Sequence, residues 1–245
     1  MRKLLTFILF IALCLPLMAQ KRLAHPEMYV GLSGGAVGSM IRFTPTIERK
    51  LLWGGNGGVT WRYVSDKYFG LQIEANYMTR GWKEKKTGYQ QYMHYIEIPA
   101  LCHIYFGRSV RGFINLGPKI SFLLAYKASS VPLTDDAQPF EPWNMTPEEI
   151  EAFAGGDPTA QYTLKPKIFD YGICGGLGME IHRIKNTRSC YYIEGRFNFS
   201  LSDIFPNGKK DYFSSSDHMN ISINFGWLFH VKGGNDKEAA KTAKN

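Results

Sequence analysis

The chain has 245 residues, of which 20% are charged, and its formal net charge is +8. This length allows one or two domains. The positive charge would suit a nucleic-acid-binding protein, but the Lys and Arg residues form no stripe along one predicted element, which excludes that class. Beyond the N-terminal segment, no stretch reaches the roughly 18 apolar residues that a membrane helix requires.

The first residues have the features of a secretory signal peptide. Arg2 and Lys3 form a basic region, residues 4–15 are apolar, and Ala19 offers a small-residue cleavage site. We therefore predict a signal peptide at 1–19 and a mature chain of 245 − 19 = 226 residues. A lipoprotein anchored through Cys14 is disfavoured, because Leu13 stands where a small residue is needed. The mature chain would then be either a soluble exported protein or a transmembrane β-barrel.

Alternation of apolar and polar residues recurs along the whole mature chain and predicts β-strands. Most segments have about ten residues, the length that a tilted strand needs to cross a bilayer. We predict an all-β fold, an eight-stranded antiparallel up-and-down transmembrane barrel at 20–231, followed by a disordered polar tail at 232–245. The predicted strands are 28–38, 53–64, 69–77, 92–106, 112–124, 168–182, 191–202 and 219–229.

The connections between these strands alternate in length. Three are short, at 65–67, 107–111 and 184–189, and four are longer, at 39–52, 81–91, 125–167 and 203–217. Short periplasmic turns and longer extracellular loops are typical of outer-membrane barrels. With an even strand number, both chain ends are expected on the short-turn side.

A soluble, lipocalin-like barrel would show the same alternation. Whether the apolar or the polar face of the strands points outward therefore decides between a transmembrane and a soluble barrel. Of 17 lysines in the mature chain, only Lys119 lies within a predicted strand, whereas a water-facing barrel should be rich in Lys and Glu. Aromatic residues gather at the short-turn ends of the strands and are expected to form an interfacial girdle. They are Tyr63, Phe69, Tyr105, Phe106, Phe113, Tyr191, Trp227 and Phe229. These observations favour the membrane barrel.

The predicted strand at 92–106 contains Glu97 and Pro99, which do not suit a lipid-facing strand. Its apolar alternate positions place both residues on the inner face, and Pro99 is expected at a β-bulge. The same parity predicts an interior polar network. Because an eight-stranded barrel is just wide enough for its own side chains, this network should be structural, although it could also gate a narrow channel. Its predicted members are Arg62, Glu74, Glu97, Lys119, Glu194 and Arg196.

Three segments resemble the small outer-membrane β-barrel family described as porin-family or PorT-like proteins. They are "YIEIPALCHIYFG" at 95–107, "FINLGPKISFLL" at 113–124 and "FDYGICGGLGMEI" at 169–181. The resemblance implies a non-enzymatic barrel of the bacterial outer membrane. PorT-like members are associated with type IX protein secretion and gliding, which suggests a scaffold or accessory role. A narrow porin-like channel for small solutes and an orphan barrel that maintains the envelope are the alternatives.

The segment 125–167 is the longest predicted loop and is acidic between 131 and 164. "TPEEIEAFAGG" within it has the capping signals of a short helix that begins at Thr146. Loops of this length are functional or disordered, and we expect an ordered docking surface for envelope or secretion-machinery proteins, with a solvated shield as the alternative. The candidate docking residues are Asp135, Asp136, Phe140, Trp143, Glu148, Glu149 and Phe153.

The basic segment 81–91 carries Lys83, Lys85 and Lys86. It could pair with the acidic loop or with anionic lipid headgroups.

The sequence gives little support for a catalytic or a metal-binding site. The candidate rim residues His94 and His218, with Asp217 and Ser216, offer no pair within expected hydrogen-bond reach. The histidines are scattered without ligand spacing. We predict no catalytic residue, no metal and no cofactor.

Overall fold

The computed structural model describes residues 26–44, 48–65, 68–107, 110–130, 146, 160–183, 189–206 and 213–232. Nearly all of them lie in strands, and the one described helix is the short 3-10 helix η3 at Ala160–Thr163. Within this part of the chain, no helix is long and apolar enough to cross a membrane. The strands are β1 (Glu27–Thr44), β2 (Arg49–Lys50), β3 (Leu52–Val64), β4 (Phe69–Glu84), β5 (Gln90–Gly107), β6 (Val110–Ala128), β7 (Phe169–Arg183), β8 (Ser189–Ser200) and β9 (Ser215–Lys232).

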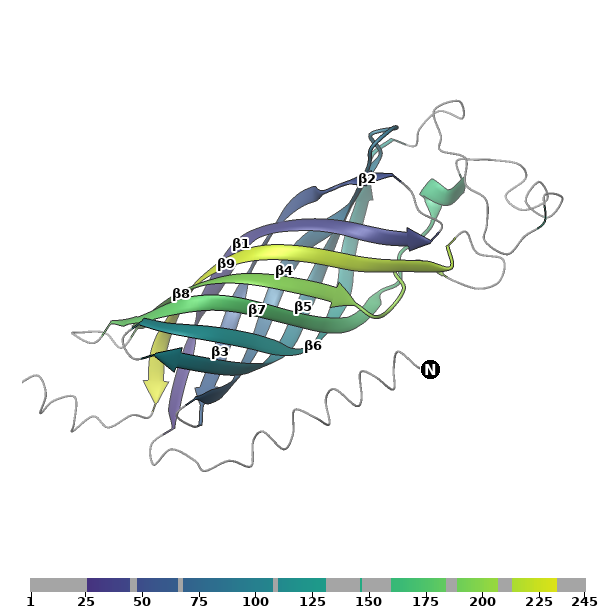
Figure 1. The fold of residues 1–245 in the computed structure, drawn as a ribbon. Coiled ribbons are helices and arrows are strands. Elements are labelled where there is room, and N and C mark those ends of the chain that lie inside the picture. Colours follow the sequence, from purple (N-terminus) through teal and green to yellow (C-terminus); the bar gives the residue numbers. More distant parts are fainter. Residues whose placement is uncertain are drawn as a thin grey trace, which may run out of the picture.

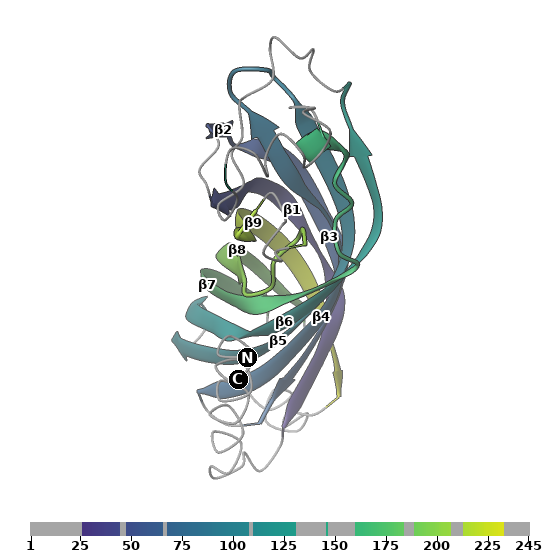
Figure 2. The same ribbon diagram turned by 90° about the vertical axis from the view of Figure 1, so that its right-hand side faces the viewer.

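The eight long strands close into a ring. Each pairs antiparallel with the next long strand along the chain, and β1 closes the barrel by pairing with β9 from Met28↔Lys232 to Thr44↔Ser215 (Figures 1 and 2). The two-residue β2 continues the path of β3 alongside the far end of β4. The predicted eight-stranded antiparallel barrel is thus confirmed.

The barrel has two distinct ends. At the short-turn end lie the connections β3–β4, β5–β6 and β7–β8, together with the start of β1 and the finish of β9. At the loop end lie the connections β1–β3, β4–β5, β6–β7 and β8–β9 (Figure 1). The longest of them is β6–β7, which joins Ala128 to Phe169.

Several strands extend beyond their predicted limits, mainly at the loop end. β4 runs to Glu84 and β5 starts at Gln90, so most of the predicted loop 81–91 is strand, and its turn contains Gly88 with a φ of 72°. The loop predicted to begin at 125 begins after Ala128, and β9 reaches Lys232, one residue into the predicted tail. Alternation is a poor guide here, because backbone pairing continues where outward residues no longer need to be apolar.

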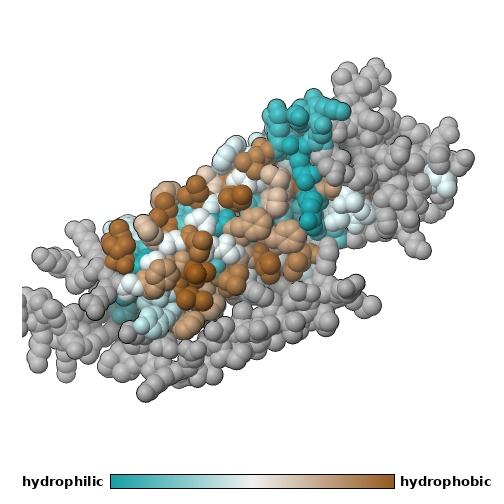
Figure 3. Space-filling view, in the orientation of Figure 1, coloured by the Kyte–Doolittle hydropathy of each residue, from teal (hydrophilic) through white to brown (hydrophobic). Residues whose placement is uncertain are grey.

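The outward face of the barrel is a broad apolar belt. On β9, Ile221, Ile223 and Phe225 are 53–60% exposed, whereas the intervening Ser222 and Asn224 are buried. Figure 3 shows the apolar residues gathered around the middle of the barrel wall. An exposed apolar surface of this size is expected against lipid and not against water. The inverted arrangement, apolar outside and polar inside, rules out the soluble barrel.

Two local predictions about side chains were wrong. Tyr105 and Phe113 were assigned to the outward girdle, but both are buried inside the barrel, because Tyr105 shares the inner parity of Glu97 on β5 and Phe113 is its ladder partner on β6. Phe106, Tyr191, Trp227 and Phe229 are exposed on the outer face, whereas Tyr63 and Phe69 are half-buried.

Pro99 does not sit at a bulge. The β4–β5 pairing is interrupted opposite Pro99 but resumes in the same register, from Ile73↔Ala100 to Asn76↔Glu97. The register shift of β5 against β6 lies between His94 and Tyr95 instead. The missing N–H therefore removes one ladder hydrogen bond without inserting a residue.

Candidate functional site: the polar interior

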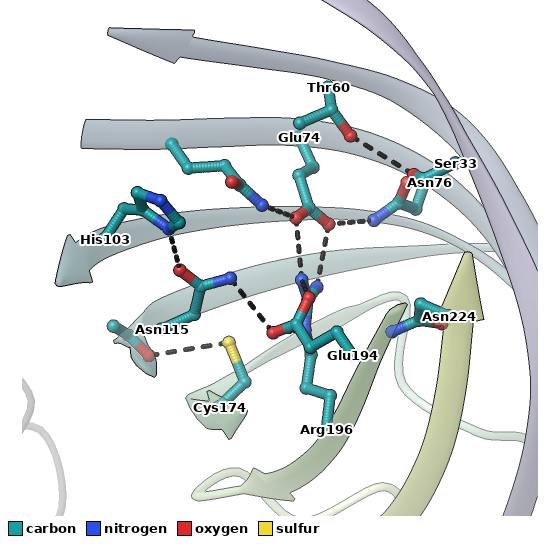
Figure 4. A network of polar contacts seen from close by, with 12 residues as sticks. Ser33, Thr60, Glu74, Asn76, His103, Asn115, Cys174, Glu194, Arg196 and Asn224 are labelled. Atoms are coloured by element: carbon teal, nitrogen blue, oxygen red, sulfur yellow. Dashed lines mark hydrogen bonds and ion pairs between the residues drawn. The ribbon is translucent and has the colours of Figure 1, made fainter. Parts of the chain in front are cut away.

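The centre of the barrel is occupied by one arginine held between two carboxylates, which we call the central cluster: Glu74, Glu194 and Arg196. The Arg196 guanidinium donates to both oxygens of Glu74 at 2.7 Å and to Glu194 at 2.7 and 3.2 Å. Asn76 and Gln72 donate to Glu74 at 2.7 and 2.5 Å (Figure 4). Strands β4 and β8, on different sides of the ring, are thereby joined through the lumen. Such bidentate pairing is the strong form of a charge-assisted hydrogen bond.

An upper cluster, nearer the loop end, contains Arg80, Glu97, Lys119 and Asp170. Lys119 Nζ lies 2.8 Å from Glu97 Oε2, and the Arg80 guanidinium lies 3.4 Å from the same oxygen and 2.6 Å from Asp170 Oδ2. Arg80 also stacks over Tyr95, with its Cζ 3.9 Å from the ring centroid. The charges of Glu97 and Asp170 are thus matched by two cations.

A lower cluster, nearer the short-turn end, consists of Arg62, Arg111 and Glu180. Arg62 forms an ion pair with Glu180 and donates to Gln72 at 2.7 Å. Arg111 and His103 each place a nitrogen 3.8 Å from a Glu180 oxygen. Gln72 also donates to Glu74, so the lower and central clusters are connected by one amide.

The three clusters balance in charge. They contain five cations and five carboxylates, so their sum is +5 − 5 = 0. Buried charges are tolerated when they are paired and hydrogen-bonded. The arrangement is that expected of a lumen whose side chains bind each other.

All six side chains that parity predicted for the interior are buried there, but they do not form one network. Glu74, Glu194 and Arg196 meet in the central cluster, Glu97 meets Lys119 in the upper one, and Arg62 pairs with none of the other five carboxylates or cations. The partners of these residues were partly missed. Glu180 and Asp170 have the inner parity of β7, so alternation could have assigned both to the interior. Arg80 lies beyond the predicted end of its strand and could not be assigned in this way.

Two clusters of buried, largely aromatic side chains lie at the two ends of the lumen, and the short-turn one packs around the lower cluster, where the Arg62 guanidinium stacks over Phe113 and Tyr192. The short-turn plug is made of strand residues alone: Tyr29, Val64, Tyr105, Phe113, Cys190, Tyr192 and Leu228. The loop-end cap combines strand residues with residues of three connections, namely Ile41, Phe43, Trp82, Tyr89, Met93, Tyr95, Tyr162, Ile204, Phe205 and Phe213. The loop residues of the cap lie in segments without periodic alternation, so their burial could not be predicted from the sequence.

The cap is tied to the barrel wall by polar contacts of η3. The Tyr162 hydroxyl donates to the Glu84 carboxylate, with oxygens 3.0 and 3.1 Å apart, and the Tyr89 hydroxyl donates to the Tyr162 carbonyl at 3.1 Å. Thr87 also donates to Glu84. Burial raises the pKa of Tyr89 to about 12, so this hydroxyl stays protonated. The root of the long β6–β7 connection is therefore fixed to the end of β4.

The candidate docking residues Asp135, Asp136, Phe140, Trp143, Glu148, Glu149 and Phe153 lie outside the described residues, as do the predicted signal peptide and most of the predicted tail.

The rim residues considered for catalysis are dispersed. His94 faces outward beside Tyr77, whereas His218 is buried in the lumen beside Tyr95. Asp217 pairs with Arg42 at 2.8 Å, away from His218. Among the described residues, no group of three or more His, Cys, Asp or Glu side chains could hold a metal ion.

Comparison with known proteins identifies a matching family. Residues 18–206 match the family model described as outer membrane protein beta-barrel domain. No curated protein matches in sequence.

Among solved structures, OprG from Pseudomonas aeruginosa is similar, with 10% identity, a TM-score of 0.46, and coverage of 86% of this chain and 97% of that one. Ail, the attachment invasion locus protein of Yersinia pestis, has 12% identity and a TM-score of 0.40, with coverage of 83% and 99%. Neisserial surface protein A has 8% identity and a TM-score of 0.43, with coverage of 81% and 95%.

Proposed function

The chain belongs to the outer membrane protein beta-barrel domain family, and from this premise we propose that it is a non-enzymatic scaffold that presents its loop end to a protein partner. In barrels of the bacterial outer membrane, short turns face the periplasm and long loops the exterior. The loop end then faces outward and carries the acidic 131–159 segment.

The observation that carries this proposal is a lumen filled by the barrel's own side chains. Paired charges fill its centre, and aromatic clusters lie at both ends. Such an interior stabilises the barrel wall and gives the loops a rigid base.

The roots of the long connection support the same role. The Ser129 N–H donates to the Gln90 carbonyl at 2.9 Å, and Tyr162 is bound to Glu84. Both flanks of the acidic segment are thereby held against the barrel. A docking segment with fixed ends loses less conformational entropy on binding than a free one.

The identity of the partner is a further part of the proposal. The PorT-like resemblance of residues 95–107, 113–124 and 169–181 suggests components of type IX secretion. Its support is the resemblance alone. A narrow solute channel is less favoured, because ten charged side chains pair with each other in the lumen and buried aromatic side chains lie at both ends. Stepwise conductance of the purified barrel in planar bilayers would support the channel instead. If the protein is an orphan envelope barrel, affinity purification should recover no partner.

The test is crosslinking in intact cells, followed by affinity purification of the tagged barrel and mass spectrometry. The decisive variant replaces 131–159 with a short Gly/Ser linker and leaves η3 in place, so that the cap is preserved. Deletion of 233–245 is the matched control. We expect the first variant to remain heat-modifiable, as folded barrels are, but to lose the envelope proteins that the wild type recovers. Recovery of the same proteins without 131–159 would refute the docking role.

A further inference from the structure

A band of lysines lies on the outer surface of the loop end, just above the apolar belt. This basic band consists of Lys50, Lys83, Lys85, Lys86 and Lys127. Figure 3 shows hydrophilic residues gathered at this end of the barrel, beside the position of β2 in Figure 1. One described acid accompanies the band: Glu48, whose carboxylate lies 3.5 Å from Lys85 Nζ. The local charge is then +5 − 1 = +4.

The pairing of the strands brings like charges together here. Lys50 and Lys83 are direct partners in the β2–β4 ladder, and like charges directly opposite each other are destabilising. Neither has an acidic partner within ion-pair distance among the described residues. Lys127 is paired with Tyr92, which is paired on its other side with Gly81 of β4, so Lys127 faces outward two strands from Lys83.

Two arginines, Arg42 and Arg49, flank the basic band. Arg42 lies beside Arg49, and partial burial together with the Arg42 charge lowers the pKa of Arg49. Arg42 is itself paired with Asp217 and stacks over Phe199, so it adds little free charge to the band.

The height of the band matches the headgroup layer. Trp53 is 67% exposed on the outer face of β3, and an outward Trp marks the membrane interface. Lys50 lies three residues beyond it, about 10 Å along the strand and about 8 Å along the barrel axis at the usual tilt. The headgroup layer is roughly 5–8 Å thick on each side, and lysine side chains extend several ångströms towards it.

We propose that the basic band binds the phosphate groups of an outer-leaflet glycolipid of the lipid A type. Two or more lysines on adjacent strands can surround one phosphate, and the ligand relieves the repulsion between Lys50 and Lys83. This site is independent of partner docking through the acidic segment.

Binding is measured by native mass spectrometry of the full-length mature barrel in detergent, titrated with lipid A at low salt. Lipid A without its phosphates is the control ligand, and inorganic phosphate is the competitor. The test variant is Lys50→Gln/Lys83→Gln. The matched control is Lys165→Gln/Lys167→Gln, which removes two exposed lysines next to β7, three strands from β4.

We expect the affinity for lipid A to fall about fivefold per lysine, and so about 25-fold in the Lys50/Lys83 variant. The control variant should bind as the wild type does, and raised salt should weaken wild-type binding. The dephosphorylated lipid should bind no better to the wild type than to the test variant.

Equal lipid A affinities of the two double variants would overturn the proposal. Displacement by an equal concentration of inorganic phosphate would overturn the assignment to a lipid. The proposal would also be overturned if Lys50→Gln/Lys83→Gln lowered the affinity for lipid A only after removal of 131–159. The acidic segment would then occupy the basic band in the intact chain.

Discussion

The strand-built interior and the loop-end cap bury similar aromatic residues but differ in what holds them. Every residue of the charged clusters and of the short-turn plug is carried by a strand, so these contacts form when the ring closes. The cap also needs the hairpin residue Tyr89, Tyr162 of η3 and residues of the β8–β9 connection. We infer that the interior unfolds only with the whole barrel, whereas the cap can open locally at a smaller free energy.

The largest effect is expected in the central cluster. Arg196→Met leaves Glu74 and Glu194 buried without their cation, and breaking a buried pair in this way costs several kcal/mol. Because two carboxylates lose one shared partner, we expect the free energy of unfolding to fall by about 5 kcal/mol. Urea unfolding of the barrel in lipid vesicles measures it, with the exposed Lys165→Met as the control.

A second variant separates the loss of pairing from the loss of packing. Glu74→Gln and Glu194→Gln added to Arg196→Met remove the uncompensated charges, so most of the lost stability should return. If Arg196→Met alone changes unfolding by less than about 1 kcal/mol, as surface substitutions do, the clusters do not hold the interior together.

A pair of identical substitutions compares the two regions directly. Phe113→Ala in the plug removes the ring that packs edge-to-face on Tyr192 at 6.0 Å and lies beneath Arg62. A core Phe→Ala change costs about 3–5 kcal/mol, here in global unfolding. Phe205→Ala in the cap should leave global unfolding almost unchanged and increase the rate at which protease cleaves the loop end. Equal effects of the two variants on global unfolding would show that the cap is as cooperative as the interior.

The same contrast explains what the sequence could predict. The period of two assigned Glu74, Glu97 and Arg196 to the lumen because each lies in a strand with a clear apolar face. It could not choose their partners, since parity fixes the face but not the register between strands, and so not the height of each side chain in the lumen. Arg80 was missed because alternation weakens towards the loop end, where the outward neighbours Thr79 and Gly81 are not strongly apolar.

Contacts made by connections left no periodic signal at all. Tyr162 and Phe205 come from segments without a regular face, and their burial depends on how the chain returns over the barrel mouth. The pairing of Lys50 on β2 with Lys83 on β4 likewise could not be predicted from the sequence. The segment around 81–91 was recognised as basic, but only the ladder shows that Lys83 stands opposite Lys50.

The smallest effect is expected for the single hydroxyl that ties η3 to β4. Tyr162→Phe keeps the ring in the cap and removes the donor to the Glu84 carboxylate. A hydrogen bond to a charged group contributes about 1.5–3 kcal/mol, which should appear as faster amide hydrogen exchange at 160–163 and not in global unfolding. Combined with Glu84→Gln in a double-mutant cycle, the hydroxyl should show a coupling of about 1 kcal/mol or more with the carboxylate. Additive single effects would mean that packing among Tyr89, Trp82 and Tyr162 holds the cap closed.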